Sequence, residues 1–545
     1  MTVKIEDLNE ARDTIHAEHA SVSPVSEAGK TPVLQMAGVS FTYANGRENA
    51  GVRDVELHVD AGEVVLLCGP SGCGKTTVTR LANGLAPQYH EGTVRGAVTV
   101  EGLDVSSAPL HRTARAVGSV FQNPKTQFFN VDVRSEIAFG CENQGMERSE
   151  IAARVEHVTR SFELDELTEH SLFDLSGGQK QRVACASATA AGPRLIVLDE
   201  PSSNLDFPSI TQLRHAIERW KSEGKAILVS EHRLHYLADL VDRAYYLNDG
   251  TVERIMTGQV LRTLSQSEIA GLGLRPVRFH NVFHQALDQA QGSPGPARTT
   301  HAETPARITL EGFSFAYKRG VRIHHALDIG QAAFPRRGIT AVIGNNGAGK
   351  STLAQALVGL NRCKGRLAMD ERILGRHSRN ASCFMVMQDV NHQLFAESVL
   401  DEILLSMTNP DEVEAMRLLD ELDLAEYASD HPLALSGGQR QRVCIASALA
   451  SGRDLVVYDE PTSGLDRAHM RQVAHLVQEV RQRGAAQVIV THDPELILAC
   501  CTEVIRLEAG RITESYALDG KDDAGARRLE RFFTSNLTDH DISGQ

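Results

Sequence analysis

Short apolar runs separated by longer amphipathic stretches recur along this chain. Residues 63–68 (EVVLLC), 194–198 (RLIVL) and 225–230 (KAILVS) have the length of buried strands. Continuous apolar runs are typical of strands that are covered on both faces, as in parallel sheets. The stretches between them have the length and periodicity of helices. The pattern predicts an α/β fold with a substantially parallel sheet.

The pattern occurs twice in the same order. The repeated segments are GPSGCGKTT (69–77) and GNNGAGKST (344–352), LSGGQKQR (175–182) and LSGGQRQR (435–442), LIVLDEPSSNLD (195–206) and LVVYDEPTSGLD (455–466), and ILVSEHR (227–233) and VIVTHDP (488–494). Lys75 and Lys350 are 275 positions apart, whereas Ser176 and Ser436 are 260 apart, so the second copy is shorter in its middle. We interpret this as a tandem duplication of a domain of about 240 residues.

Composition changes at the edges of the two copies and suggests the domain boundaries. Residues 291–305 (QGSPGPARTTHAETP) are rich in Pro, Gly and Thr, as expected for a flexible connection. The tail has the pattern of one short helix. We therefore expect a disordered lead-in (1–31), a first domain (32–268), a linker (269–305), a second domain (306–518) and a C-terminal tail (519–545).

Charge, cysteine usage and hydropathy restrict the function classes. The net charge of −14 argues against a broad nucleic-acid surface. The nine cysteines form no CxxC pair, which favours buried thiols in a reducing compartment over disulfides or a zinc site. The polar N-terminus does not resemble a signal peptide, and no apolar stretch approaches about 18 residues. We expect a protein that does not span a membrane by itself.

In each half a G-x-x-x-x-G-K-[ST] segment follows a predicted strand and opens a predicted helix, which is the context of a P-loop. Its backbone N–H groups and helix N-terminus suit phosphate, Lys75 and Lys350 suit the β- and γ-phosphates, and Thr76 and Ser351 suit Mg²⁺. The predicted phosphate-binding residues are Gly69, Pro70, Ser71, Gly72, Cys73, Gly74, Lys75, Thr76 and Thr77, and Gly344, Asn345, Asn346, Gly347, Ala348, Gly349, Lys350, Ser351 and Thr352.

Carboxylates end one apolar strand in each half. Asp199 and Asp459 lie where a buried charge needs a cation, and we expect them to hold Mg²⁺. The adjacent Glu200 and Glu460 suit a general base that polarises an attacking water. His232 and His492 follow another apolar strand. Such a histidine is often a packing or capping residue, but its position here favours contact with a γ-phosphate.

The LSGGQ segments precede helix-forming stretches with small residues on one face. Ser176 and Ser436 have the position of N-caps, and the glycines after them expose backbone N–H groups. A second anion site and a merely well-capped helix both fit this pattern. The residues concerned are Ser176, Gly177, Gly178 and Gln179, and Ser436, Gly437, Gly438 and Gln439.

The ordered set of motifs in each half resembles the nucleotide-binding domain of ABC ATPases, over about residues 32–250 and 307–510. The resemblance implies in each half a core parallel sheet, an antiparallel β subdomain and a helical subdomain. It also implies ATP and Mg²⁺, with Gln122 and Gln388 as Q-loop residues near the metal, SSNLD and SGLD as D-loops, and His232 and His492 as switch histidines. It implies two ATP sites in a head-to-tail pseudo-dimer. The first would combine Lys75, Thr76, Gln122, Asp199, Glu200 and His232 with Ser436, Gly437 and Gly438. The second would combine Lys350, Ser351, Gln388, Asp459, Glu460 and His492 with Ser176, Gly177 and Gly178.

Tyr43 and Tyr317 lie where that family stacks an aromatic ring on adenine, although a strand-edge tyrosine fits equally well. Two departures from the family pattern are SEHR around His232 and Asn204 in the first D-loop. Neither removes a catalytic group, so we expect two competent sites.

The segment QNPKTQFFNVDVRSEIAFG (122–140), with its looser copy at 388–405, resembles the ATPase subunits of energy-coupling factor (ECF) transporters. The resemblance implies uptake of a vitamin, a vitamin precursor or cobalt or nickel. The implied partners are a transmembrane coupling subunit and a substrate-binding membrane subunit, with the chain peripheral on the cytoplasmic face of the membrane and without nucleic acid. Phe128 and Phe129 are neighbours, so one is expected to pack inward and the other to help line a groove for a coupling helix.

A soluble tandem ABC ATPase that acts on ribosomes is the alternative. One kind needs an N-terminal cysteine cluster, and no cysteine precedes Cys68. Another kind usually has a long charged helical linker, which residues 291–305 are not. A DNA-repair ABC ATPase would need zinc CxxC modules. These observations favour the transporter interpretation.

Overall fold

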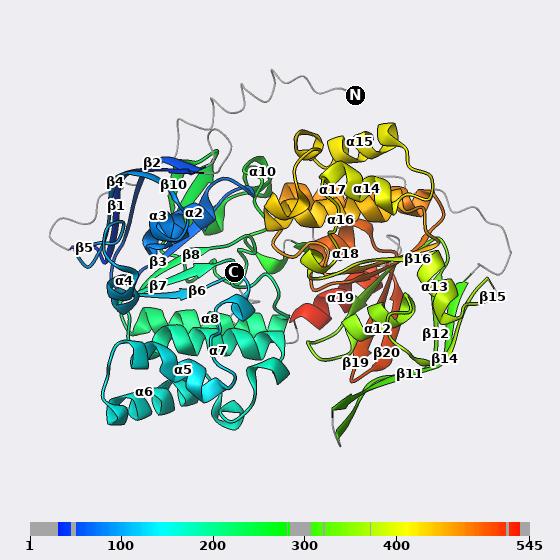
Figure 1. The fold of residues 1–545 in the computed structure, drawn as a ribbon, viewed down its shortest axis with the longest axis horizontal. Helices are drawn as coiled ribbons and strands as arrows, with labels where there is room; N and C mark the ends of the chain where they lie inside the picture. The colour runs from blue at the N-terminus through cyan, green and yellow to red at the C-terminus, as the bar shows by residue number, and fades with distance from the viewer. Residues whose placement is uncertain are drawn as a thin grey trace.

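The computed structural model describes residues 31–44, 51–280, 282–283, 307–319, 322–370, 372–518 and 523–534. Nearly all of the predicted lead-in, residues 284–305 of the predicted linker, and residues 519–522 and 535–545 of the predicted tail lie outside these ranges. Figure 1 shows two similar halves side by side, the first in blue to green and the second in yellow to red.

Each half has a six-stranded core sheet in which neighbouring strands are parallel, except for one antiparallel pair at an edge, β9 with β10 in the first half and β19 with β20 in the second. The strand orders are β10-β9-β3-β8-β7-β6 and β16-β17-β18-β13-β19-β20. The bounds in the first sheet are β3 (Val64–Cys68), β6 (Val117–Val120), β7 (Leu195–Asp199), β8 (Ala226–Ser230), β9 (Arg243–Asn248) and β10 (Thr251–Thr257). Those in the second are β13 (Ile339–Ile343), β16 (Cys383–Val386), β17 (Leu455–Asp459), β18 (Ala486–Val490), β19 (Glu503–Glu508) and β20 (Arg511–Ala517).

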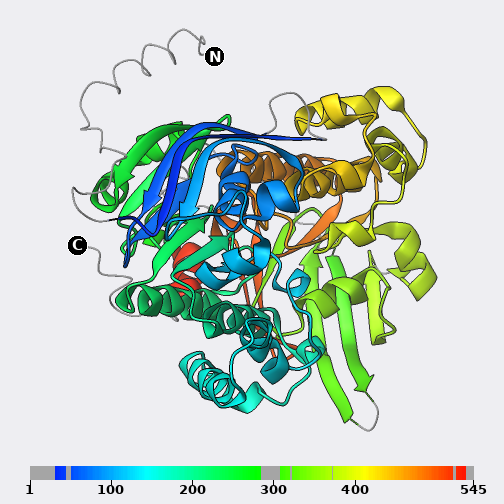
Figure 2. The same cartoon turned by 60° about the vertical axis from the view of Figure 1, so that its left-hand side comes forward.

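A four-stranded antiparallel sheet packs on each core sheet, as Figure 2 shows in blue for the first half. The strand orders are β2-β1-β4-β5 and β12-β11-β14-β15. The bounds are β1 (Leu34–Tyr43), β2 (Gly51–Val59), β4 (Gly92–Val100), β5 (Leu103–Asp104), β11 (Arg307–Arg319), β12 (Arg322–Pro335), β14 (Lys364–Met369) and β15 (Arg372–Ile373).

Helices cover the core sheets and form a separate helical part in each half. In the first half they are α2 (Lys75–Ala82), α3 (Leu85–Gln88), α4 (Leu110–Ala116), α5 (Val133–Asn143), α6 (Arg148–Ser161), α7 (Gly177–Ala190), α8 (Phe207–Ser222), α9 (Gly258–Thr263) and α10 (Gln266–Gly271). In the second they are α12 (Lys350–Leu357), α13 (Arg376–Ser382), α14 (Val399–Ser406), α15 (Glu412–Glu421), α16 (Gly437–Ala450), α17 (Arg467–Gln482), α18 (Pro494–Cys500) and α19 (Asp523–Thr534). Short 3₁₀ turns are η1 (Pro124–Thr126), η2 (Asp165–Leu167), η3 (Leu172–Asp174), η4 (Val390–His392), η5 (Ala425–Tyr427) and η6 (Pro432–Ala434).

This architecture confirms the predicted fold class, with two α/β cores and two antiparallel subdomains. All nine cysteines lie in the described residues as free thiols, and all but Cys363 are buried. No described helix is both long and apolar enough to cross a membrane.

The two halves share part of one apolar core. Phe207 of the first half, together with Phe279 and Phe283 of the predicted linker, packs in the main core cluster of the second half. They meet Leu529 and Phe533 of α19, the red helix between the halves in Figure 1. The tail helix expected from the sequence therefore packs between the two halves.

Candidate active sites

The two predicted P-loops connect β3 to α2 and β13 to α12 with the same geometry. Gly74 and Gly349 hold φ values of 102° and 101° immediately before their helices. A Cβ on Gly69 would lie 2.1 Å from the Leu247 carbonyl oxygen, and one on Gly344 would lie 2.2 Å from that of Leu507. These glycines are therefore required by close backbone approach as well as by conformation.

The P-loop lysines are buried and folded over their own loops. Nζ of Lys75 donates to the carbonyl oxygens of Gly69 (2.9 Å) and Pro70 (2.8 Å). Nζ of Lys350 donates to those of Gly344 (2.8 Å) and Asn345 (3.1 Å). Each ammonium is thus held within its own P-loop, a position that fits a polyphosphate.

A hydroxyl and a buried carboxylate meet beside each P-loop. Oγ1 of Thr76 donates to Oδ1 of Asp199, and Oγ of Ser351 donates to Oδ1 of Asp459, both at 3.2 Å. Burial raises the pKa of both aspartates to about 6. A hydroxyl oxygen and a carboxylate deprived of solvent are suitable ligands for Mg²⁺, so these residues fit the implied metal.

Glu200 and Glu460 follow the two aspartates in the left-handed backbone region, with φ values of 45° and 52°. Oε2 of Glu200 accepts a hydrogen bond from Nε2 of Gln122 (2.8 Å), and its Oε1 lies 3.5 Å from Nε2 of His232. Oε1 of Glu460 lies 3.7 Å from Nε2 of His492, while Gln388 is exposed on the loop after β16. Such strain in a non-glycine residue is common at functional sites.

The pKa values of the two glutamates are shifted in opposite directions. Burial raises the pKa of Glu200, but His232 and Lys75 outweigh burial and leave the pKa below its ordinary value. Burial raises the pKa of Glu460 to about 7, with Lys350 opposing and Asp459 reinforcing the shift. Glu200 is therefore the more readily ionised base.

Both histidines bury a ring nitrogen beside the glutamate of their site, Nε2 of His232 at 3.5 Å from Glu200 and Nε2 of His492 at 3.7 Å from Glu460. In the described part of the chain, Nε2 of His232 and Nε2 of His492 have no hydrogen-bond partner. A γ-phosphate oxygen would supply one. The unusual Glu231 before His232 is itself buried, and it accepts hydrogen bonds from the backbone N–H groups of Ser202, His232 and Arg233. Glu231 thereby fixes the loop, a role that the sequence analysis did not assign.

The LSGGQ segments are capped helix starts, as predicted. Oγ of Ser176 accepts from the Gln179 N–H, whose side chain in turn accepts from the Ser176 N–H, and Ser436 and Gln439 do the same. A Cβ on Gly177 would lie 3.9 Å from Nδ2 of Asn346, so the first LSGGQ faces the second P-loop. Within the described residues, no atom lies within 4 Å of the corresponding point on Gly437.

Reciprocal hydrogen bonds cross between the halves at the D-loops. The Ser71 N–H donates to Oδ2 of Asp466, and the Asn346 N–H donates to Oδ2 of Asp206, both at 2.7 Å. A Cβ on Gly464 would lie 2.8 Å from Nε2 of Gln122. The sequence analysis named the D-loop motifs but did not identify these aspartates as ligands of the opposite P-loop.

Tyr43 and Tyr317 lie at corresponding strand ends beside the P-loop helices. The hydroxyl of Tyr43 is 3.1 Å from Oγ1 of Thr77, and that of Tyr317 is 3.3 Å from Oγ1 of Thr352. Tyr317 is exposed and Tyr43 is half-buried against the core, so a role at adenine and a strand-edge role both fit.

Comparison with known proteins agrees with this geometry. The profile of the ABC transporter family matches residues 52–203 and 331–463. A protein of Treponema denticola, provisionally named an ABC transporter ATP-binding protein, is 38% identical over 92% of this chain and 100% of its own length. One of Methanosarcina acetivorans with the same name is 32% identical over 88% of this chain and 85% of its own length.

Among solved structures, archaeal ABCE1 in a ribosome-bound complex with Pelota aligns with a TM-score of 0.62 at 21% identity, over 91% of this chain and 80% of that one. The archaeal ribosome recycling factor aABCE1, crystallised with stalk protein aP1, aligns with a TM-score of 0.57 at 20% identity, over 90% and 91%. At these identities the likeness shows the tandem fold alone.

Proposed function

We propose, from the premise that this chain belongs to the ABC transporter family, that it is the ATP-hydrolysing subunit of a membrane importer of the ECF type. Membership of the family implies ATP hydrolysis. The importer, its cargo and the residue roles below are our proposals.

In the proposed mechanism, each ATP lies between the P-loop of one half and the LSGGQ segment of the other. Lys75 and the loop N–H groups hold the β- and γ-phosphates, and the LSGGQ amides face the γ-phosphate. Mg²⁺, when bound, neutralises charge on the phosphates. Glu200 accepts a proton from a water molecule while the oxygen of that water bonds to the γ-phosphorus. The P–O bond to ADP breaks, and its electron pair leaves on ADP. His232 contacts the transferred phosphoryl oxygen.

An exposed apolar surface in each half supports the proposal of a membrane partner. Phe129 is 75% exposed and Phe395, at the corresponding position, is 78% exposed. Phe128 instead packs against the core, so one of the two neighbours points inward as the sequence predicted. Exposed apolar groups at corresponding positions of both halves are typical of a contact site.

In each half, one buried glutamate accepts the hydrogen bonds that hold the exposed phenylalanine outward. Oε2 of Glu136 accepts from the N–H groups of Phe129 (3.0 Å) and Asn130 (2.8 Å). Oε2 of Glu402 accepts from those of Phe395 and Ala396, both at 2.8 Å. This fixed presentation of an aromatic ring, made twice, is the observation that carries the proposal.

Further apolar side chains extend each surface. Leu172 donates its N–H to the Val131 carbonyl oxygen (2.8 Å), which places the exposed Phe173 close to the Phe129 loop. In the second half Leu433 corresponds to Phe173 and is also exposed. Two such surfaces suit two coupling helices of a transmembrane subunit, which would hold the chain peripherally on the cytoplasmic face. A separate membrane subunit would then select a vitamin, a vitamin precursor, or cobalt or nickel.

The test replaces Phe129 and Phe395 with serine, singly and together, and measures ATP hydrolysis, pull-down of membrane subunits and uptake on the same preparations. Loss of buried aromatic contacts should lower pull-down and uptake by at least about tenfold in the double variant. Hydrolysis by the isolated chain should persist, because neither ring touches the nucleotide residues. Ile373→Ser, which alters an exposed side chain of β15, is the matched control.

Unchanged pull-down and uptake in the double variant would contradict the proposed coupling surface. Sedimentation of the chain with ribosomes and not with membranes would favour the alternative, a soluble tandem ATPase acting on ribosomes.

A further inference from the structure

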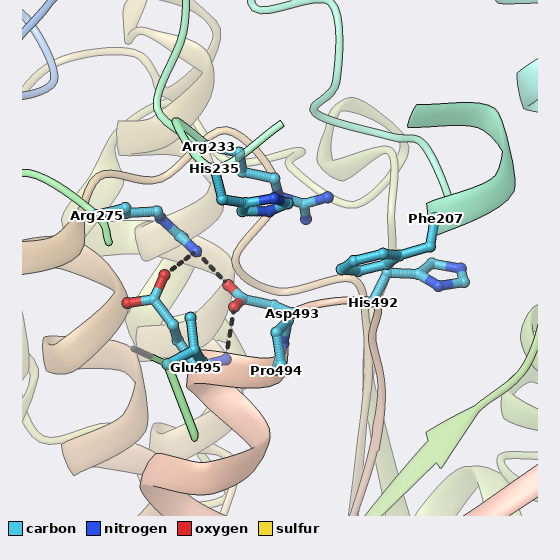
Figure 3. A pocket seen from close by; sticks show the side chains of 9 residues that line it. Phe207, Arg233, His235, Arg275, His492, Asp493, Pro494 and Glu495 are labelled. Atoms are coloured by element: carbon cyan, nitrogen blue, oxygen red, sulfur yellow. Dashed lines mark hydrogen bonds and ion pairs between the residues drawn. The ribbon is translucent and has the colours of Figure 1, made fainter. Parts of the chain in front are cut away.

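One arginine of the predicted linker is buried against the second half. Arg275 follows α10 and is 4% exposed. Its Nε and Nη2 donate to the Leu465 carbonyl oxygen (3.1 and 2.9 Å), and its Nη1 donates to Oδ2 of Asp493 (2.7 Å). Glu495 is 3.4 Å from the same Nη1, as Figure 3 shows. A single guanidinium thus binds a backbone carbonyl and two carboxylates across the interface.

The groups bound by Arg275 belong to two functional loops. Leu465 lies in the second D-loop, and Asp493 directly follows His492. Asp493 also accepts from Oγ1 of Thr462, directly before that D-loop (2.9 Å), and from the Glu495 N–H at the start of α18 (3.1 Å). Arg275 therefore completes a buried network that fixes the D-loop relative to the switch histidine.

Those loops serve both candidate sites. Asp466, next to Leu465, accepts from the Ser71 N–H of the first P-loop, and Gly464 packs beside Glu200. His492 lies 3.7 Å from Glu460 in the second site. A shift of the loops held by Arg275 would alter the first site through the D-loop and the second through His492.

The corresponding place in the first half is aromatic. Phe207 and His235 occupy the positions of Arg467 and Glu495, and their rings stack at 5.8 Å with an interplanar angle of 7°. Phe279, four residues after Arg275, packs on both rings (Figure 3 shows Phe207 and His235). The segment that carries Arg275 is thus anchored to both switch regions, by an ionic contact on one side and an apolar contact on the other.

We propose that Arg275 is a positioning residue for ATP hydrolysis, which holds the second D-loop and the second switch histidine in register with both sites. It touches no nucleotide-binding residue of either P-loop. The proposal rests on the ATPase activity of the family and does not depend on a membrane partner.

The test compares the full-length chain with Arg275→Met and Arg275→Lys, and measures kcat, the Kd for ATP and Tm. Methionine keeps an unbranched stem but removes every donor. We expect kcat to fall by about tenfold in Arg275→Met while the Kd changes by less than about twofold. Lysine can reach Asp493 or the Leu465 carbonyl but not both, so Arg275→Lys should recover part of kcat.

Arg379→Met is the matched control. Arg379 is also buried, but the contacts of its guanidinium lie within the second half, at the Ala356 carbonyl oxygen and over the Phe313 ring. It should lower Tm with little effect on kcat. An equal fall of kcat in the control, or an unchanged kcat in Arg275→Met, would overturn the proposal.

Site-resolved measurements complete the test. Glu200→Gln leaves hydrolysis at the second site alone, and Glu460→Gln leaves it at the first. The Arg275→Lys change should reduce kcat in both backgrounds, and combining it with Asp493→Asn should cost less than the two separate losses together. Full additivity with Asp493→Asn would show that Arg275 does not act through Asp493.

Discussion

At the scale of single residues, the two candidate bases carry out the same task in unequal surroundings. Glu200 has Gln122 and His232 within reach, and its pKa is lowered, whereas burial raises the pKa of Glu460 to about 7. A glutamate must be ionised to accept a proton from water. We therefore expect the first site to be the better prepared for hydrolysis at neutral pH and the second to lose activity more readily in acid.

Replacing both glutamates by glutamine should trap bound ATP. The amide keeps the size of the side chain but cannot accept the proton, so we expect turnover to fall at least about 100-fold while the Kd for ATP is retained. Phosphate release and equilibrium dialysis measure the two quantities. Near-normal hydrolysis in Glu200→Gln with Glu460→Gln would remove both residues as the bases.

His235 should make the stability of the chain sensitive to acid. Its ring is buried between Phe207 and Phe279, and burial, with Arg233 and Arg275 nearby and Asp493 opposing, lowers its pKa from 6.5 to about 3. The unfolded chain binds a proton below about pH 6.5 and the folded chain does not. The stabilisation is complete above that pH and is lost as the pH falls toward 3.

His235→Phe keeps the aromatic contact and removes the titration. Between about pH 6.5 and pH 5, the unfolding free energy of the variant should fall less steeply than that of the wild type, by up to about 1.4 kcal/mol per pH unit. The pH dependence of Tm reports the difference. His111→Phe, which changes an exposed histidine, should leave the slope unchanged, and equal slopes for His235→Phe would contradict a neutral buried ring.

Residues within short motifs were predictable, and residues that join distant segments were not. Lys75, Thr76 and Asp199 follow from a local spacing whose chemistry needs those residue types. Arg275 stands in an unremarkable loop, and its partners are about 190 and 218 positions away in sequence. Comparing the two copies did not indicate Arg275, because aromatic residues occupy the corresponding interface of the first half.

At the scale of elements, the helix starts at LSGGQ connect one half with the other. Each capping serine accepts one first-turn N–H, that of Gln179 in α7 or Gln439 in α16, which leaves the other first-turn N–H groups for an anion. Gly177 already lies against Asn346, whereas Gly437 stands further from its predicted partner loop. The second site is therefore the more tightly assembled of the two in this conformation.

Arginine at a capping serine should disable the P-loop of the opposite half. The bulky cation in Ser436→Arg would block the amides that face the γ-phosphate on Lys75, and Ser176→Arg would do the same for Lys350. We expect turnover at the affected site to fall by about 100-fold. Crosslinking of a photoreactive ATP analogue, followed by separation of the halves, identifies the site. Loss of labelling in the same half as the substitution would refute the head-to-tail pairing.

Elements were predicted where periodicity and length agreed. The strand ends at Asp199 and Asp459 and the opposite orientations of Phe128 and Phe129 follow from the alternation of a strand or extended segment. The buried Glu136 that turns Phe129 outward could not be foreseen, because its hydrogen bonds go to backbone N–H groups that no side-chain pattern reports. The sequence indicated a short helix after residue 518, but not that α19 would pack between the halves.

At the scale of the whole molecule, the duplication has produced an interface within one chain. The two halves are joined by reciprocal hydrogen bonds that Asp206 and Asp466 accept from the opposite P-loops. They are also joined by the shared cluster of Phe207, Phe279 and Phe533. The effective concentration of one half around the other is therefore high, and pairing within one chain is favoured over pairing between two chains. The different groups at corresponding positions, ionic around Arg275 and aromatic around His235, also prevent the two interfaces from being interchangeable.

Nucleotide should therefore close the molecule without changing its mass. In the Glu200→Gln and Glu460→Gln double variant with ATP and Mg²⁺, light scattering should report a single chain at all protein concentrations, while the radius of gyration from X-ray scattering decreases. Each half contains a complete P-loop and an LSGGQ segment for the other half. One chain therefore supplies all the parts of both ATP sites. As a control, Ser176→Arg and Ser436→Arg combined with the double variant should abolish the compaction. A doubling of mass on addition of ATP would mean that the sites form between chains, and the intramolecular arrangement of the two halves would then have to be abandoned.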